Sequence, residues 1–360
     1  ITGCFAQEQG KELLKKFPQI DIIMGNQNIG RIPQAIDDIE HKTNKHVIYT
    51  DCEDELPPRL DADFDSKKTA SISITYGCNN FCTYCIVPYV RGRERSVPLD
   101  EIIHDVKQYA EKGYKEIILL GQNVNSYGKD FKNGDNFAKL LEEICKVEGD
   151  FLVRFISPHP RDFSDEVIDV IAKNDKIAKS LHLPLQSGST RILKMMNRGY
   201  TKEQYIALAE KIKERIPGVA LTADIIVGFP GETEEDFLDT LDVVKRIQFE
   251  NSFMFMYSIR QGTKAAEMDE QIDSEVKKER LQRLIEVQNS CSLAESETYM
   301  GKTVRILVEG ESRKNKDVLT GRTSTNKIVL FKGDKALEGT FVNVKIYDCK
   351  TWTLYGDIVD

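Results

Sequence analysis

The stretch Gly77-Cys78-Asn79-Asn80-Phe81-Cys82-Thr83-Tyr84-Cys85 contains three of the eight cysteines of this 360-residue chain. Thiolates are soft ligands that suit iron–sulfur clusters and zinc. A Cys-x3-Cys-x2-Cys loop supplies three of them and so leaves one metal position without a protein ligand. An open position is typical of a reactive metal site, whereas structural sites are normally closed by four ligands. The spacing therefore predicts a metal site held by Cys78, Cys82 and Cys85.

This cysteine loop leaves two other interpretations open. One is a structural zinc site completed by Cys52 or His104, and the other is three unrelated core cysteines. Core cysteines rarely lie so close together in sequence, which favours the metal site. The remaining cysteines are scattered, and the first residues carry no basic-then-apolar signal pattern. A disulfide framework is therefore disfavoured, and the cytoplasm is the expected compartment.

The middle of the chain alternates short apolar runs with longer amphipathic ones. Runs such as Ile117-Ile118-Leu119-Leu120 are typical of strands buried on both faces of a parallel sheet. Strands that alternate with helices form an α/β barrel or an open doubly wound sheet, and ligands bind at the carboxyl ends of the strands in both. The predicted strands are Ser71–Tyr76, Glu116–Leu120, Leu152–Ser157, Ser180–Leu183, Leu221–Val227 and Ser252–Tyr257. The predicted helices are Leu99–Lys112, Asn136–Val147, Ser164–Lys173, Thr190–Met196, Lys202–Arg215 and Glu234–Ile247.

Patterning divides the chain into four segments. Residues 51–68 are charged and contain prolines, which is typical of a linker, and residues 69–300 form the barrel region. Residues 301–360 alternate strands with turn residues and predict a small β-barrel. Residues 1–50 predict half of an α/β domain, with elements at Ile1–Gly3, Gln7–Lys16, Asp21–Met24 and Arg31–Ile39. The later elements are a helix at Ser274–Met300 and strands at Thr303–Val308, Lys327–Phe331 and Thr340–Tyr347.

Composition excludes some classes of protein. With 40% hydrophobic and 30% charged residues the chain is typical of soluble globular proteins. No apolar run approaches the roughly 20 residues of a membrane span, so no membrane association is expected. The formal net charge of −8 disfavours a protein that coats nucleic acid along its whole surface. Residues 301–360 nevertheless carry 11 Lys and Arg against 8 Asp and Glu, which favours a local anionic partner there.

The cysteine loop, with the aromatic Tyr84 before its last cysteine, resembles the radical S-adenosylmethionine (SAM) superfamily. Four further segments are similar to the methylthiotransferases within it. They are CIVPYVRGRE (residues 85–94), LGQNVNSYG (120–128), HLPLQSGS (182–189) and DIIVGFPGE (224–232). The segment GRTSTNK (321–327) resembles the RNA-binding TRAM module of the branch that modifies tRNA. Together these similarities cover essentially the whole chain.

The resemblance implies a partial (β/α)6 barrel, in which a [4Fe–4S] cluster on Cys78, Cys82 and Cys85 cleaves SAM. A second [4Fe–4S] cluster supplies sulfur, and a second SAM supplies the methyl group. The implied reaction adds a methylthio group to C2 of N6-dimethylallyladenosine next to the anticodon, at position 37 of the tRNA. Threonylcarbamoyladenosine in tRNA and an aspartate of a ribosomal protein are alternative targets. The alternative from another class is a non-catalytic RNA-binding protein with structural zinc.

Cys4 is the residue that the resemblance assigns to the auxiliary cluster. The family's N-terminal domain carries three such cysteines, and the segment TGCFAQ at residues 2–7 matches only the last of them. The other two are expected upstream of Ile1. We therefore expect a fragment that lacks the first half of that domain and has an incomplete second cluster. Without the resemblance, Cys4 would be interpreted as a buried core cysteine.

Polar residues that follow the predicted strands are candidates for holding SAM, because the protein binds and orients a cofactor that supplies the chemistry. Ser157 and Gln186 are predicted to hydrogen-bond its ribose or methionine groups, although such residues often cap helices instead. Arg198 can pair with the SAM carboxylate, and Ile226 is placed to pack on adenine. The full predicted set for SAM is Tyr84, Asn123, Ser157, Gln186, Arg198 and Ile226.

Basic residues near the site and in the last module are candidates for contacting RNA. Arg91 and Arg93 follow the cysteine loop, where phosphate contact competes with the simpler interpretation of a solvated charge run. Arg322 and Lys327 are the corresponding candidates in the module at residues 301–360. The predicted RNA contacts are therefore Arg91, Arg93, Arg322 and Lys327.

The predicted partners are the tRNA anticodon loop and an electron donor such as flavodoxin or ferredoxin. We expect a monomer. No catalytic residue is predicted beyond the clusters and SAM, and His159 and His182 are expected to be structural.

Overall fold

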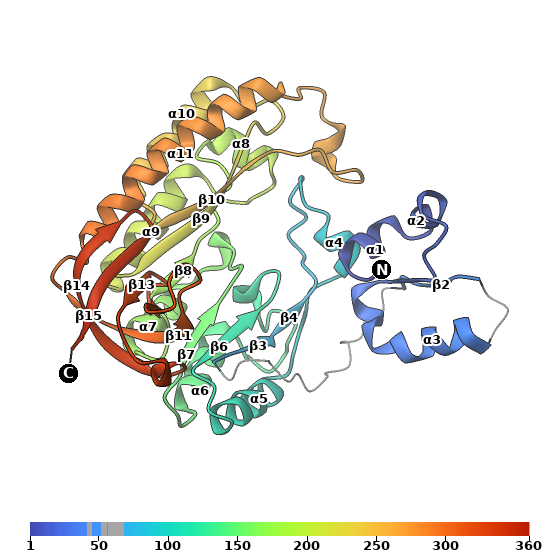
Figure 1. The fold of residues 1–360 in the computed structure, drawn as a ribbon. Helices are drawn as coiled ribbons and strands as arrows, with labels where there is room; N and C mark the ends of the chain where they lie inside the picture. The colour runs from blue at the N-terminus through green and yellow to red at the C-terminus, as the bar shows by residue number, and fades with distance from the viewer. Residues whose placement is uncertain (42–44, 52–55, 57–67, 360) are drawn as a thin grey trace.

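The computed structural model describes residues 1–41, 45–51, 56 and 68–359. Figure 1 shows a small N-terminal unit, a central α/β unit and a C-terminal β-barrel, with the N-terminal unit beside the end of the central unit that carries α4 (Val87–Arg91). Most of the predicted linker, residues 51–68, lies outside the described residues. Among the described residues, no helix combines the length and apolar character that crossing a bilayer requires.

The N-terminal unit has two parallel strands, β1 (Ile22–Met24) and β2 (Val47–Tyr49), and β2 was not predicted. The strand predicted at Ile1–Gly3 is wrong, because only Thr2 forms a bridge, to Met24. The single helix predicted at Gln7–Lys16 is also wrong. The chain is already helical at Cys4 and is interrupted at Gly10, which has a positive φ of 45°. The helices of this unit are α1 (Cys4–Gln9), α2 (Lys11–Lys16) and α3 (Ile32–His41).

The central unit confirms the predicted partial barrel. Its six parallel strands form two three-stranded sheets in chain order, and a bridge between Val153 and Ile177 links the sheets. The strands are β3 (Thr69–Ser73), β6 (Glu116–Leu120), β7 (Leu152–Phe155), β8 (Ser180–His182), β9 (Ala220–Val227) and β10 (Asn251–Met256). The helices packed outside are α5 (Leu99–Glu111), α6 (Phe137–Lys146), α7 (Asp165–Lys173), α8 (Thr190–Met195), α9 (Lys202–Arg215), α10 (Glu234–Ile247) and α11 (Ser274–Glu297).

Burial alternates along β9 and separates its two faces. Leu221, Ala223, Ile225 and Val227 are buried under the helices, whereas the residues between them are partly exposed. Successive side chains of a strand point to opposite faces, so the partly exposed ones line the inside of the barrel. The interior of this partial barrel is therefore accessible, as a substrate site requires.

The first predicted strand, Ser71–Tyr76, is divided in the structure. After β3 the chain bends, and β4 (Thr75–Tyr76) pairs antiparallel with β5 (Arg95–Ser96). Gly77 follows with φ 75°, and a Cβ there would lie 2.1 Å from the carbonyl oxygen of Arg93. Only glycine fits this close approach, which directs the following cysteine loop across the end of the barrel.

The C-terminal unit is a closed barrel with strand order β11-β12-β13-β15-β14. It confirms the predicted small β-barrel, although β12 and β15 were not predicted. Ile306, Val308, Val329 and Val344 form part of its core. The strands are β11 (Thr303–Glu311), β12 (Leu319–Thr323), β13 (Ile328–Phe331), β14 (Phe341–Lys350) and β15 (Thr353–Val359).

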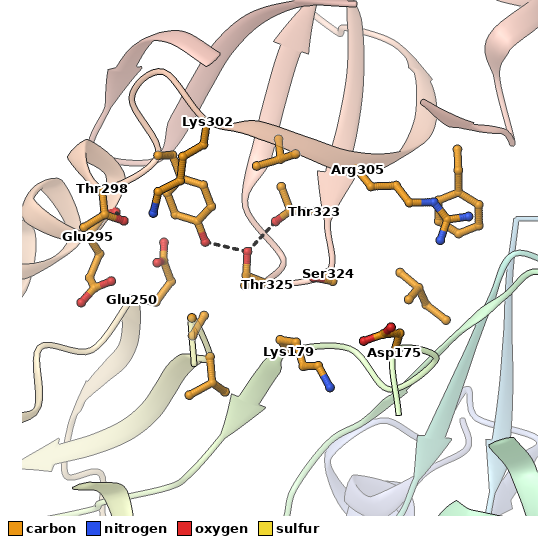
Figure 2. Close-up of a pocket in the computed structure, with 17 residues that line it drawn as sticks. Asp175, Lys179, Glu250, Glu295, Thr298, Lys302, Arg305, Thr323, Ser324 and Thr325 are labelled. Atoms are coloured by element: carbon orange, nitrogen blue, oxygen red, sulfur yellow. Dashed lines mark hydrogen bonds between the residues drawn. The ribbon is translucent and has the colours of Figure 1, made fainter. Parts of the chain in front are cut away.

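The C-terminal barrel docks against the amino ends of the central strands. Arg154 of β7 donates to the carbonyl oxygens of Thr323 and Ser324 at 2.8 and 2.9 Å and pairs with Glu116. A cavity of about 550 Å³ lies at this junction (Figure 2). The hydroxyl groups of Tyr299 and Thr325, which line it, are 2.7 Å apart. The cysteine loop lies after β4, at the carboxyl end of the strands. The carboxyl end of the strands therefore carries the cysteine loop, and the amino end carries the C-terminal barrel.

Candidate metal centre

A cavity of about 480 Å³ lies at the carboxyl ends of the barrel strands. It brings together residues that are far apart in the sequence, including all three cysteines of the loop. Of the predicted site residues, those that line it are Cys4, Cys78, Cys82, Tyr84, Cys85, Arg91, Ser157, Gln186 and Arg198. Ligand sites of α/β barrels are built at this end, where loops bring side chains from several strands together.

Backbone hydrogen bonds hold the cysteine loop. The Cys85 N–H donates to the carbonyl of Cys82 at 2.9 Å, and the Cys78 N–H donates to the carbonyl of Gly92 at 3.2 Å. Thr83 donates its N–H to the carbonyl of Met196 and its hydroxyl to that of Met195. These hydrogen bonds therefore attach the loop to the end of α8.

The three thiols suit a soft metal group. Cys78 and Cys82 are buried, and Cys85 is partly exposed. Burial, with a smaller contribution from the neighbouring thiols, raises the pKa of Cys78 to about 11, and burial also raises the pKa of Cys85. A metal must displace these protons to bind. Three soft donors on one cavity wall fit the [4Fe–4S] cluster of the radical SAM superfamily, with one iron left for SAM.

The zinc interpretation requires a fourth ligand. His104 is exposed on α5, where its Nε2 lies 3.1 Å from the side-chain nitrogen of Gln108, and it does not line the cavity. Cys52 lies outside the described residues. Across the described ranges, no three His, Cys, Asp or Glu side chains are placed to hold a single metal ion. The described residues therefore offer no completed zinc site.

Ser157 and Gln186 have an uncommon backbone conformation where they enter the cavity. Their φ angles are +60° and +66°, in the left-handed region that non-glycine residues rarely adopt. The N–H of Gln186 donates to Asp224, and its carbonyl accepts from Ile226, so β9 holds this conformation. Strained residues of this kind concentrate at binding sites. Both predicted SAM contacts therefore face the cavity.

Arg198 is buried, 5% exposed, and lies against the cysteine loop. Its Nη1 donates to the Cys82 sulfur at 3.3 Å, and its Nε donates to the Tyr200 hydroxyl at 3.2 Å. Its Nη2 donates to the carbonyl of Pro184 at 3.4 Å. The guanidinium is thus placed beside a cluster ligand, and it also borders the cavity that would receive SAM.

Two predicted SAM contacts, Asn123 and Ile226, do not line this cavity. Asn123 is 2% exposed and donates to Asp162 at 2.8 Å, while its neighbour Gln122 lines the cavity instead. The Gln122 side-chain oxygen is buried without a hydrogen-bond partner among the described residues. Ile226 packs with Tyr84 in a small apolar cluster around Phe229. The strand-end position alone did not distinguish Asn123 from Gln122.

His159 also lines the cavity, although the sequence predicts a structural role for it. Its Nδ1 accepts the N–H of Arg161 at 3.2 Å, so the proton of the neutral ring is on Nε2. That nitrogen has no partner among the described residues. Burial, together with the charges of Arg198 and Arg161, lowers the pKa of His159 to about 2, which keeps the ring neutral. His159 therefore offers the cavity a hydrogen-bond donor.

Cys4 reaches the same cavity from the N-terminal unit. Its sulfur accepts from Asn26 Nδ2 at 2.9 Å and from Arg91 Nε at 3.3 Å. The predicted RNA contact Arg91 thus has a partner inside the protein. Arg93 lies over the ring of Phe81, 4.9 Å from its centre. The structure brings Cys4, the three loop cysteines and four of the predicted SAM contacts into one cavity, the four being Tyr84, Ser157, Gln186 and Arg198.

Lys327 differs from its predicted role. It is 4% exposed, and its ammonium pairs with Glu250 across the junction with the central unit. This geometry argues against the predicted phosphate contact and assigns Lys327 to docking the C-terminal barrel. Arg322 pairs with Glu309 at 2.7 Å and lines a second cavity, inside the central barrel.

Replacing Lys327 with alanine tests this reassignment. We expect a lower melting temperature, because the change leaves Glu250 buried without its partner. The slope of log affinity for tRNA against log salt should stay unchanged, whereas loss of a phosphate contact would reduce it by about 1. Titration at several salt concentrations measures the slope. A smaller slope together with an unchanged melting temperature would contradict the reassignment and would support Lys327 as an RNA contact.

Comparison with known proteins gives the family. Residues 72–244 match the model of the radical SAM superfamily, and residues 297–359 match that of the TRAM domain. The chain is 76% identical over 359 residues to tRNA-2-methylthio-N(6)-dimethylallyladenosine synthase of Fusobacterium nucleatum subsp. nucleatum, with 100% of this chain and 82% of the relative covered. It is 48% identical over 362 residues to the enzyme of the same name from Moorella thermoacetica, with the same coverage.

A solved structure supports the fold. The radical SAM enzyme coproporphyrinogen III oxidase (HemN) from Escherichia coli aligns with a TM-score of 0.50 at 13% identity, over 72% of this chain and 68% of that one. At this identity the similarity concerns the fold alone. The relatives with matching sequence are radical SAM enzymes, so the chain is an enzyme of this type and uses a [4Fe–4S] cluster and SAM. The chain belongs to the radical SAM methylthiotransferases, in the tRNA-2-methylthio-N(6)-dimethylallyladenosine synthase family.

Proposed function

We propose that this chain adds a methylthio group to C2 of N6-dimethylallyladenosine in tRNA, next to the anticodon at position 37. The observation that carries the proposal is one cavity, lined by the three loop cysteines, by Cys4, and by Ser157 and Gln186. At the open end of the barrel, this cavity brings cysteine ligands for a cluster together with polar side chains that can bind SAM. The relatives named for this reaction match along the whole chain.

Cys78, Cys82 and Cys85 hold the first cluster, which supplies an electron to SAM when bound. Arg198 orients the Cys82 thiolate and places a positive charge beside it, within reach of the SAM carboxylate. Ser157 and Gln186 bind polar groups of SAM, assisted by the free donor of His159 and the free acceptor of Gln122. Tyr84 lines the same cavity, while Asn123 and Ile226 support its wall through contacts with Asp162 and with the apolar cluster around Phe229.

Cys4 serves as a ligand of an auxiliary cluster that supplies sulfur. The hydrogen bonds from Asn26 and Arg91 hold its sulfur at the edge of the cavity. Because Cys4 borders the same cavity as the loop cysteines, an auxiliary cluster held there would supply sulfur to that cavity. This role gives Arg91 a function at the cluster, while Arg93 and Arg322 remain the proposed contacts to RNA.

The proposed partner is the tRNA anticodon loop, whose base must leave its stack to reach the cavity. A small electron carrier such as flavodoxin or ferredoxin supplies the electron. The enzyme acts as a monomer in the cytoplasm.

The test is anaerobic turnover of the reconstituted protein with reductant, SAM and an anticodon stem-loop. The substrates are stem-loops that carry dimethylallyladenosine or threonylcarbamoyladenosine, and a ribosomal-protein peptide that contains aspartate. We expect a methylthio group only on the dimethylallyl stem-loop, detected by mass spectrometry of its nucleosides. Methylthiolation of either other substrate in preference to it would contradict the proposal.

A further inference from the structure

Strand β10 exposes two aromatic rings on the inner face of the barrel. Phe253 and Phe255 are 53% and 52% exposed, and they neighbour Asp224 and Ile226 of β9 in the register. On the opposite face, Ser252 is buried and its hydroxyl donates to Gln288 of α11 at 2.8 Å. Because side chains alternate along a strand, both phenylalanines point into the barrel, away from α11. Figure 1 shows β10 as the last strand of the central sheet, beside α11.

The ring of Phe253 faces space that is continuous with the reaction cavity. Phe253 and the 45% exposed Ile156 line a second cavity of about 540 Å³ inside the barrel. Ser157, His182 and Asp224 border both this cavity and the one that contains the cysteines. The ring of Phe253 meets that of His182 edge to face, with centres 6.2 Å apart. The aromatic wall therefore begins where the cysteine cavity ends.

The chain after β10 returns to the cysteine loop. Ala265 donates its N–H to the carbonyl of Thr83 at 2.9 Å, and a Cβ on Gly262 would lie 3.6 Å from Ile86. The segment that follows the wall therefore packs against the cysteine loop, and an apolar group bound along the wall would be close to the reaction cavity.

We propose that Phe253 and Phe255 bind the dimethylallyl group of the target adenosine and so select it. This inference rests on the proposed function, which makes that base the substrate. The group is attached to the same six-membered ring as the reacting C2, so a wall beside the reaction cavity is within its reach. Contact with a hydrocarbon removes the exposed phenylalanine rings from water, which favours binding. The dimethylallyl group is a branched hydrocarbon of this kind.

The same wall disfavours a polar substituent. A threonylcarbamoyl group carries a carboxylate, which would lose water where it lies against the two rings. The two arginines that line the second cavity, Arg154 and Arg322, already pair with Glu116 and Glu309. Asp224, whose side chain is 34% exposed, borders the space next to Phe253 and would repel that charge. Attraction of one substituent and repulsion of the other together give specificity.

Binding of two stem-loops to the purified protein tests the proposal. The stem-loops differ only in the dimethylallyl group, and affinity is measured for the wild type, Phe253→Ala/Phe255→Ala and Phe253→Leu/Phe255→Leu. We expect the wild type to prefer the modified stem-loop at least about tenfold, the alanine variant to lose most of that preference, and the leucine variant to keep part of it. The control is Phe17→Ala, a phenylalanine that is 47% exposed beside α2 and should leave the preference unchanged.

Three results would overturn either this inference or the proposed function on which it rests. An unchanged preference in the alanine variant overturns the inference while wild-type product formation keeps the proposed function. Equal loss of affinity for both stem-loops, together with weaker SAM binding, also overturns it, because the rings would then contact SAM. Absence of methylthiolated product from the wild type on the dimethylallyl stem-loop would overturn the proposed function itself.

Discussion

Replacing Cys82 with alanine is expected to abolish reductive cleavage of SAM, with a loss of at least about 1000-fold in the rate of 5′-deoxyadenosine formation. The three thiolates act as a unit, so removal of any one removes the function of all of them. Cys82 is the most informative position, because its sulfur also accepts a hydrogen bond from Arg198. Chromatographic measurement of 5′-deoxyadenosine and of bound iron in the anaerobically reconstituted protein checks this.

The matched control is Cys349→Ala. Cys349 lies on β14 in the C-terminal barrel, is partly exposed, and does not line the cavity. It should retain wild-type iron content and SAM cleavage. A Cys82 variant that keeps its iron and cleaves SAM at the wild-type rate would show that the cavity is not the cluster site.

Replacing Arg280 with methionine is expected to lower the melting temperature by about 10 °C, from a loss of about 3–5 kcal/mol. Arg280 and Glu232 are 6% and 1% exposed at their side chains, and their Nη1 and Oε1 atoms lie 2.8 Å apart. Glu232 also accepts the N–H of Gly228, so this pair attaches the turn after β9 to α11. Without Arg280, a carboxylate would remain buried with no cation beside it.

Calorimetric scans of Arg280→Met should be compared with scans of Arg283→Met. Arg283 lies on the same helix and pairs with Glu234 at 2.8 Å, but its side chain is 34% exposed, so its loss should cost about 1 kcal/mol or less. The double variant Arg280→Met/Glu232→Gln should regain part of the lost stability, because it removes the orphaned charge. Equal shifts for Arg280→Met and Arg283→Met would contradict the importance of burial.

The cost of Arg280→Met should also depend on pH. Burial raises the pKa of Glu232 to about 7 in the folded protein, against the opposing influence of Gly228 and Arg280, from an ordinary value of 4.5. A raised folded pKa means that the group's contribution to stability is complete below about 4.5 and is lost as the pH rises through 7. The variant should raise the pKa further, so its deficit should be small near pH 5 and largest above pH 7.

The sequence predicted the central unit well, because its strands are apolar runs and its cysteines are tightly spaced. It missed β12 and β15, which contain Gly321 and Gly356. The structure shows why glycine stands at these two positions. A Cβ would lie 2.9 Å from the Leu307 carbonyl oxygen at Gly321, and 2.5 Å from that of Lys345 at Gly356. Close contact between strands is a tertiary property that a single strand's pattern does not contain.

At the candidate site too, some residues can be predicted from the nearby sequence, whereas the roles of others depend on residues that are distant in the sequence. The cysteine loop was predicted from its spacing, and Ser157 and Gln186 from their positions after predicted strands together with the family resemblance; all of them line the cavity. The burial of Lys327 depends on Glu250, which is distant in the sequence, and no pattern near Lys327 indicates that pairing. The position of His159 in the cavity was not predicted for a related reason. Only the fold shows that one of its ring nitrogens accepts a hydrogen bond and that the other has no partner among the described residues.

The docking of the C-terminal barrel affects which nucleotide of a bound RNA reaches the cysteine cavity. Separating the units would expose Lys327 and Glu250 and break the two hydrogen bonds from Arg154 to the backbone, so the units are expected to move as one body. The distance between an RNA-binding surface on the C-terminal barrel and the cysteine cavity is then constant. An RNA held at both places would have its target nucleotide chosen by its distance along the chain as well as by its chemistry. Lengthening the anticodon loop by one nucleotide would thus move a different base to the reactive centre.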